Sequence, residues 1–174
     1  LYSPDSFVEM DRIEFGAEEE VSNLKVCQLK GDPDQFGKNR EVKVPCVVVS
    51  TCYQQGEDMA SAGRLLVFEL FYDTNAEAEL PDGRTPVRLK QIAEKPFNTP
   101  ATALCQIGGH IFHSEGSHIY VHMMDWDSKT LVPAAFFDAQ TYMTCAVSIK
   151  NYVLWGDMVK SAFLMRWTEE DQGE

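Results

Sequence analysis

The chain has 174 residues, of which 44% are hydrophobic, and its 27 acidic side chains outnumber the 15 basic ones to give a net charge of -12. This length and composition suit one domain, or slightly more, with a sizeable buried core. Nucleic-acid binding draws most of its affinity from Lys and Arg side chains that neutralise phosphates. A chain this acidic is therefore a poor stand-alone nucleic-acid binder, and a basic protein is a better-suited partner.

Signals for membrane insertion and secretion are missing from the sequence. No run reaches the roughly 18 apolar residues of a transmembrane helix. Residues 1–15 have neither the basic nor the apolar region of a signal peptide. We therefore expect no membrane association. The same segment lacks an initiator Met, which suggests a piece of a longer protein.

The cysteines are odd in number, and no two are spaced as Cys-x-x-Cys. This pattern argues against a disulfide framework and against a zinc ribbon. Each cysteine lies among apolar residues, as buried free thiols do. A reducing compartment, the cytosol or the nucleus, is expected. The five residues are Cys27, Cys46, Cys52, Cys105 and Cys145.

The predicted elements are almost all strands. In chain order, residues 14–30 fit a helix or a strand about equally well. The later segments are short, rich in Val, Ile, Leu and aromatic residues, and bounded by turn formers such as Gly108-Gly109. No segment holds helical periodicity over three turns, so the chain is predicted to be all-β. The later strands are expected at 44–53, 63–72, 87–94, 101–107, 118–124, 144–149 and 152–155.

Two polar segments between predicted strands are expected to form mobile loops. Residues 30–43 contain Gly and Pro, and residues 73–86 contain a Pro-Asp-Gly turn signal. The acidic end of the chain, residues 169–174, is expected to fray.

An internal repeat organises the second half of the chain. Residues 102–116 align with residues 144–158, and after a two-residue slip 117–123 align with 161–167. Each copy reads strand, tight turn, strand, acidic turn, strand. Antiparallel strands with a period of about 40–50 residues are typical of β-propeller blades.

The repeat predicts one propeller fragment that spans the whole chain. A closed propeller needs at least four blades, so the expected fold is a partial β-propeller, an incomplete ring of about three blades. Open strand edges and bare apolar faces predict self-association of the isolated fragment. The expected blades are 21–94, 101–137 and 143–168, with 11–16 as the outer strand of an earlier blade.

Four histidines that lie close together, His110, His113, His118 and His122, raise the hypothesis of a zinc site. Strand geometry argues against it. His110 and His113 point to opposite faces of a strand. His118 and His122 share a face but lie about 13 Å apart along it. We expect structural or solvated histidines and no metal site.

Catalytic signals are weak elsewhere. The chain has no G-x-S-x-G nucleophile elbow and no Gly-rich phosphate loop. Asp125 and Asp127 resemble a carboxylate pair, but they lie where a hairpin turn with Asp-Ser hydrogen bonds is expected. The acidic run 18–20 is interpreted as a solvated turn. No catalytic residue and no cofactor are predicted.

The segment WGDMVKSAFLMRW, residues 155–167, admits three interpretations: an amphipathic helix, a loop with a catalytic Asp157, or two strands joined by a turn. A helix would have no clean polar face. As strands, the segment places alternate residues on two covered faces, as stacked blades require. We therefore expect Gly156, Asp157 and Ser161 to form a structural turn, in which Asp157 accepts backbone N–H groups.

The residues quoted above also carry a family resemblance. The segments TALCQIGGHIFHSEGSHIYVH and AFFDAQTYMTCAVSIKNYVLWGDMVKSAFLMRWTEED resemble the C-terminal region of the largest subunit of the cleavage and polyadenylation specificity factor (CPSF). The GDMVKS turn is shared with a wider superfamily that includes the large damaged-DNA-binding protein and an SF3b splicing subunit. YQQGED, GRLLVFEL and AFFDAQTYM favour the CPSF branch. Trp155 stands where the family usually has a small residue.

The resemblance implies a nuclear scaffold without enzyme activity. In that family the protein organises a WD-repeat subunit and a zinc-finger subunit that read the polyadenylation signal, so pre-mRNA is reached through the complex. The alternatives are a related propeller adaptor of a ubiquitin ligase or of the SF3b complex, and, in another class, a propeller enzyme such as a hydrolase or lyase.

Overall fold

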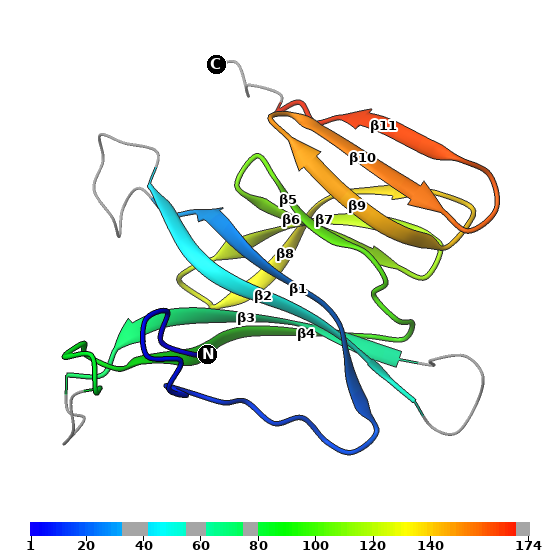
Figure 1. Ribbon diagram of the computed structural model, residues 1–174. Coiled ribbons are helices and arrows are strands. Elements are labelled where there is room, and N and C mark those ends of the chain that lie inside the picture. Colours follow the sequence, from blue (N-terminus) through cyan, green and yellow to red (C-terminus); the bar gives the residue numbers. More distant parts are fainter. Residues whose placement is uncertain (33–41, 55–61, 75–79, 170–174) are drawn as a thin grey trace.

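The structure, a computed structural model, describes residues 1–32, 42–54, 62–74 and 80–169. The regular elements in this part are all strands, arranged in three antiparallel sheets (Figure 1). Here no helix is long and apolar enough to cross a membrane. The strands are β1 (Glu19–Lys30), β2 (Lys43–Tyr53), β3 (Ala62–Tyr72), β4 (Val87–Phe97), β5 (Leu104–Ile107), β6 (His110–Glu115), β7 (His118–Asp125), β8 (Thr130–Asp138), β9 (Met143–Ile149), β10 (Tyr152–Asp157) and β11 (Ala162–Arg166).

Each sheet is a simple meander in which consecutive strands pair. The orders are β1-β2-β3-β4, β5-β6-β7-β8 and β9-β10-β11. The first strands of the three sheets lie together, with β5 in contact with both β1 and β9, and the last strands β4 and β8 also touch. The three sheets therefore stack face to face around a common inner side, as propeller blades do, and the fold is an all-β partial propeller.

The ambiguous segment 14–30 is resolved as a strand from Glu19 onward. β1 begins at Glu19 and pairs with β2 along its whole length. Residues 11–16 do not form the outer strand that the repeat predicted for an earlier blade; they are irregular. The strand predicted over 87–94 continues to Phe97 through Pro96. A proline fits there because β4 is an edge strand and needs no further ladder donors on its free side.

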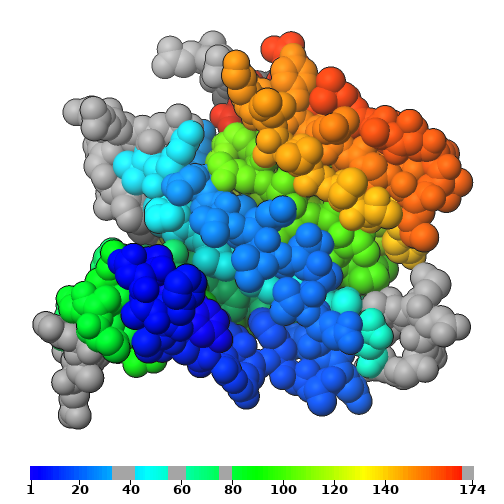
Figure 2. Space-filling model, in the orientation of Figure 1, coloured from blue at the N-terminus to red at the C-terminus, as the bar shows by residue number. Residues whose placement is uncertain are grey.

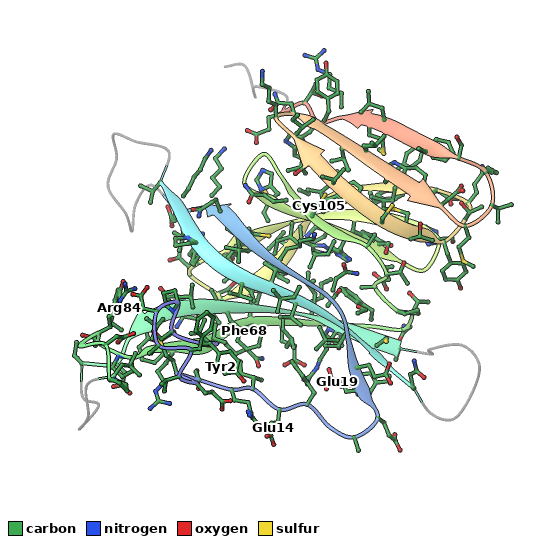
Figure 3. All side chains as sticks on the ribbon, in the orientation of Figure 1. Tyr2, Glu14, Glu19, Phe68, Arg84 and Cys105 are labelled. Atoms are coloured by element: carbon green, nitrogen blue, oxygen red, sulfur yellow. The ribbon has the colours of Figure 1, made fainter. Side chains whose placement is uncertain are left out.

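The N-terminal segment lies across the outer face of the first sheet instead. It is held near residues 81–86, where Ser6 donates to Asp82 at 3.1 Å and Arg84 pairs with Asp5 (Figure 2). Farther along, Phe15 packs against an apolar cluster on this face, and Figure 3 places Phe68 between the sheet and the segment. The other members of the cluster are Val47, Val49, Leu66 and Leu89.

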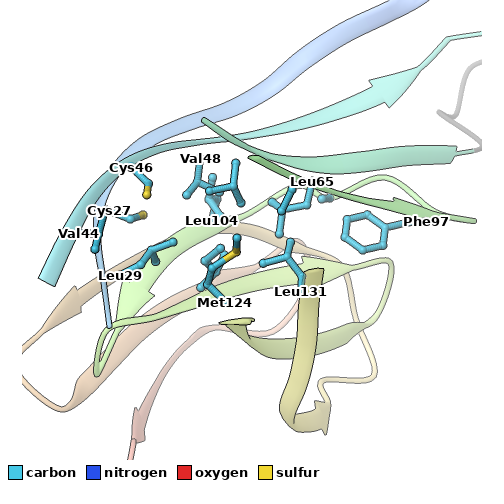
Figure 4. Close-up of a cluster of buried hydrophobic side chains, with 14 residues drawn as sticks. Cys27, Leu29, Val44, Cys46, Val48, Leu65, Phe97, Leu104, Met124 and Leu131 are labelled. Carbon is cyan, nitrogen blue, oxygen red and sulfur yellow. The ribbon is translucent and has the colours of Figure 1, made fainter. Parts of the chain in front are cut away.

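Two hydrophobic cores lie between the three sheets. The core between the first and second sheets contains side chains from both, including Leu29, Leu65 and Met124 (Figure 4). The core between the second and third sheets contains Phe112 and Trp155. Because side chains alternate along each strand, neighbouring residues of the second sheet serve different cores. Burial of these apolar side chains is the main stabilising term of the stack.

The cysteine prediction is confirmed for most of the thiols and wrong for one. All five cysteines are free, and Cys27, Cys46 and Cys105 are buried. Cys145 is exposed because it lies on the outer face of the third sheet, where no further layer covers it. The central parts of both predicted loops, 33–41 and 75–79, lie outside the described residues.

Candidate interaction surface

The outer face of the third sheet is apolar and exposed. Cross-strand pairing places Val147 and Leu164 on either side of Leu154. In the next row, Tyr152 lies beside Ile149. These side chains are 40–71% exposed, with Tyr152 the least and Ile149 the most. Contiguous apolar patches on a protein surface mark interaction sites, so this face, hereafter the outer apolar face, is the candidate site of the chain.

A groove opens on the other side of the third sheet, between it and the second sheet. The groove has a volume of about 270 Å³ and runs between β11 and the exposed side of β8. Phe136 and Phe137 of β8 line one side, and Met165 and Trp167 line the other. The first two sheets have four strands and the third has three, so β11 keeps a free hydrogen-bonding edge. Such an edge is a template for another extended segment.

The opposite face of the third sheet is anchored by Trp155. This ring is 2% exposed and stacks on Phe163 with centroids 4.3 Å apart. Its indole Nε1–H is buried and has no hydrogen-bond partner among the described residues. Phe163, Met165 and Trp167 pack toward this core, whereas Leu164 points outward. The alternation predicted for these strands is confirmed, but the row of side chains that contains Leu164 is exposed and not covered as predicted.

The turn that joins β10 to β11 is built on Asp157. Its Oδ1 accepts the backbone N–H groups of Val159, Lys160 and Ser161 at 3.0, 2.6 and 3.1 Å. Its Oδ2 accepts the Thr141 hydroxyl at 2.7 Å, and its own N–H donates to the Ser161 carbonyl. The Thr141 hydroxyl and these backbone donors lower the pKa of Asp157 to about 2. The carboxylate is thus ionised and fully used as an acceptor, which suits a turn rather than proton transfer.

Gly156, the residue before Asp157, lies close to the neighbouring strand. A Cβ at this position would lie 3.3 Å from the Cys145 Sγ of β9. The strand therefore passes close to its neighbour just before the turn, and glycine leaves room for that approach.

The four histidines do not converge. His113 and His122, on β6 and β7, form a buried pair with Nε2 and Nδ1 2.8 Å apart. His110 instead faces Glu169, with Nε2 3.2 Å from Oε1. Burial and the neighbouring His122 lower the pKa of His113 to about 3, and burial lowers that of His122 to about 4. Across the described ranges, no group of three His, Cys, Asp or Glu side chains could hold a metal ion.

The contact between His113 and His122 escaped sequence reasoning. On the sequence alone, His118 and His122 are the histidines that share a face, because they lie four residues apart on one strand. The partner of His122 comes from the adjacent strand instead. The short hairpin between β6 and β7 could have predicted this contact. Its turn places Glu115 opposite His118, and in that register His113 and His122 are diagonal neighbours on one face of the sheet.

The acidic run 18–20 is only in part the solvated turn that the sequence suggested: Glu18 and Glu20 are exposed and Glu18 lies in a turn, but Glu19 is buried. Glu19 is 8% exposed, and its carboxylate accepts two N–H groups of Arg64, at 2.6 and 2.7 Å, and the Thr51 hydroxyl. Burial alone would raise the pKa of Glu19, but Arg64 and Thr51 outweigh it and lower the pKa. The sequence of β1 does not reveal this, because the two partners of Glu19 come from β2 and β3.

Two other predictions concern surface carboxylates. The Asp-Ser turn at 125–128 is confirmed, since Asp125 accepts the Asp127 and Ser128 N–H groups and the Ser128 hydroxyl. Fraying from residue 169 is wrong for Glu169 itself, because this side chain pairs with Lys30 at 3.3 Å. Residues 170–174 lie outside the described part of the chain.

Comparison with known proteins gives relatives named CFT1 and cleavage and polyadenylation specificity factor subunit 1. Protein CFT1 of Yarrowia lipolytica is 31% identical over 161 residues, which cover 92% of this chain and 12% of the relative. Protein cft1 of Aspergillus fumigatus is 30% identical over 174 residues, covering 98% and 12%. The probable cleavage and polyadenylation specificity factor subunit 1 of Oryza sativa is 27% identical over 124 residues, covering 71% and 8%. The chain thus spans about an eighth or less of these relatives.

The family match extends over nearly the whole chain. The family model of the CPSF A subunit region matches residues 1–173. This range contains all three sheets, the Asp157 turn and the outer apolar face. The chain therefore belongs to the CPSF A subunit region family.

Proposed function

We propose that the chain is part of a nuclear scaffold for cleavage and polyadenylation of pre-mRNA. The observation that carries the proposal is the family match over residues 1–173, together with relatives named as cleavage and polyadenylation specificity factor subunit 1. The net charge of the chain, -12, favours protein partners over direct RNA contact. The partners proposed are the WD-repeat and zinc-finger subunits of the same complex, and pre-mRNA is reached through them.

The scaffold role is performed by binding, and the outer apolar face is where we place it. Leu154 and Leu164 are 45% and 66% exposed beside each other, and the free edge of β11 adjoins them. The two apolar side chains lose contact with water when another sheet packs on them, which stabilises the assembly by about 25 cal/mol per Å² of apolar surface. We propose that further blades of the ring continue from this face and this edge.

Self-association of the isolated chain follows from the same surface. In the absence of its natural cover, the outer apolar face binds a second copy. The double variant Leu154→Lys/Leu164→Lys places two charges on this face and is expected to shift the chain toward monomer in analytical ultracentrifugation. Met158→Lys, an exposed residue of the turn, is the matched control. A monomeric wild-type chain at high concentration would contradict this part of the proposal.

The functional test is affinity purification from cells of the full-length protein that contains this chain. Mass spectrometry should identify polyadenylation factors, and Leu154→Lys/Leu164→Lys should reduce their recovery relative to Met158→Lys. Recovery of a cullin or of SF3b proteins in place of polyadenylation factors would contradict the proposal. It would favour a related propeller adaptor of a ubiquitin ligase or of the SF3b complex.

A further inference from the structure

A polar hollow lies where the inner strands of the three sheets meet. Its volume is about 510 Å³. The face seen in Figure 2 brings the blue β1, green β5 and orange β9 segments next to one another. All three sheets contribute to the lining: β1 and the start of β2, the end of β5 with its Gly108-Gly109 turn, and β9 with the turn at 150–151. The hollow therefore forms only when the sheets stack.

The charges around this hollow have one sign. Three lysines line it: Lys25 and Lys43 come from the first sheet, and Lys150 comes from the turn after β9 of the third sheet. No Asp or Glu is among its described lining residues. All three lysines are exposed. Within the described part of the chain, none forms an ion pair, in contrast to Lys30 and Arg64. A basic site in a chain of net charge -12 is a local reversal of the overall field.

The floor of the hollow is neutral and largely apolar. Cys27, Cys105 and Ile107 lie there, each at most 5% exposed. Burial raises the pKa of Cys27 to about 11 and that of Cys105 to about 12, so neither thiol is ionised at neutral pH. Val26 and Val147, 66% and 59% exposed, extend the apolar surface to the rim.

We propose that this hollow binds an acidic extended segment of a partner protein. Carboxylates of the segment pair with the three ammonium groups, and small apolar side chains between them contact Val26 and Val147. The described lining residues include no aromatic ring on which a base could stack, and stacking is a main source of affinity for single-stranded RNA. Charge complementarity therefore favours an acidic peptide over RNA. The site uses the inner strands of the stack and shares Val147 with the outer apolar face.

The test is fluorescence anisotropy with the purified chain and a labelled peptide in which Glu and Asp alternate with Ala. The triple variant Lys25→Gln/Lys43→Gln/Lys150→Gln is expected to weaken binding by about tenfold or more, because exposed ion pairs contribute modestly and three are lost. The affinity of the wild-type chain should fall as salt is raised from about 50 to about 500 mM, over which the Debye length shortens severalfold.

The matched control is Lys90→Gln/Lys129→Gln/Lys160→Gln, which removes three exposed lysines outside the hollow and is expected to leave peptide affinity within about twofold. Circular dichroism verifies that both triple variants fold. Equal loss of affinity in both would show a non-specific charge effect and overturn the proposal. Tighter binding of a single-stranded RNA of equal length than of the peptide would overturn it as well.

Discussion

The interface between the first and second sheets and the interface between the second and third sheets use opposite faces of the same four strands. The first contains an ionisable pair, His113 and His122, covered by Phe97, which stacks on His113 at 4.9 Å. The second contains Trp155 and a hydroxyl cluster in which Ser114 bonds to Thr102, and Thr102 in turn donates to the Met143 carbonyl across the sheets.

The difference between these interfaces lies in the buried imidazole pair of the first, whereas the imidazole beside the second, His110, packs on Trp167 and faces the carboxylate of Glu169. Imidazoles gain a proton in water near pH 6.5, whereas indole and hydroxyl groups do not titrate in the accessible range. The two interfaces should therefore respond differently to acid and similarly to loss of packing.

Loss of packing at the second interface is tested by Trp155→Ala. Removal of this buried ring leaves a cavity that the β-sheets cannot fill, so the free energy of unfolding should fall by about 3–5 kcal/mol. Urea unfolding measures the change. Leu154→Ala, on the exposed face of the same strand, should cost about 1 kcal/mol or less.

Trp155→Phe sharpens this result. The variant keeps an aromatic ring against Phe163 and removes the indole N–H that has no partner, so its loss should be far smaller than that of Trp155→Ala. Equal losses for Phe and Ala at this position would show that the ring does not hold the interface.

Acid should weaken the first interface specifically. The folded-state pKa of His122 is about 4 and that of His113 about 3, both below the ordinary value. The unfolded chain therefore takes up protons first as the pH falls, and stability that is complete above pH 6.5 is lost toward pH 4, by on the order of 3 kcal/mol for each histidine. Lys95 of β4 lowers both pKa values further.

Urea unfolding at pH 7, 6 and 5 measures this dependence, because most carboxylates titrate at lower pH. His122→Asn keeps a group that can donate to His113 but does not titrate, and it should reduce the slope by about half. Trp155→Phe should leave the slope unchanged. A flat wild-type profile over this range would contradict the assignment of a neutral buried pair.

The smallest expected effect concerns the hydroxyl cluster of the second interface. The Ser114 hydroxyl oxygen accepts the N–H groups of Thr102 and Ala103 at 3.0 and 2.9 Å. Ser114→Ala leaves both donors without this acceptor, at a cost of about 2 kcal/mol that does not vary between pH 7 and 5. Ser128→Ala, in an exposed turn, is the control and should cost about 0.5 kcal/mol or less. A pH-dependent loss for Ser114→Ala would mean that the two interfaces are coupled.

Sequence reasoning succeeded where the information is local. The all-β class and the antiparallel order follow from short apolar segments between turn residues, and the Asp125 turn follows from Asp and Ser spacing. It failed at Glu19 and at residues 11–16. A carboxylate in an acidic run looks solvated until Arg64 of another strand lies beside it, and a segment that packs on a sheet face looks like a strand by composition.

What the sequence by itself determined is the kind of element, the repeat and the family, because alternation, turn chemistry and motif similarity are properties of neighbouring residues. What only the tertiary structure decided is which faces are covered. The inward direction of Trp155, the outward direction of Leu154, and the meeting of Lys25 with Lys150 depend on how the sheets stack, and stacking is set by non-directional burial of apolar surface summed over three sheets.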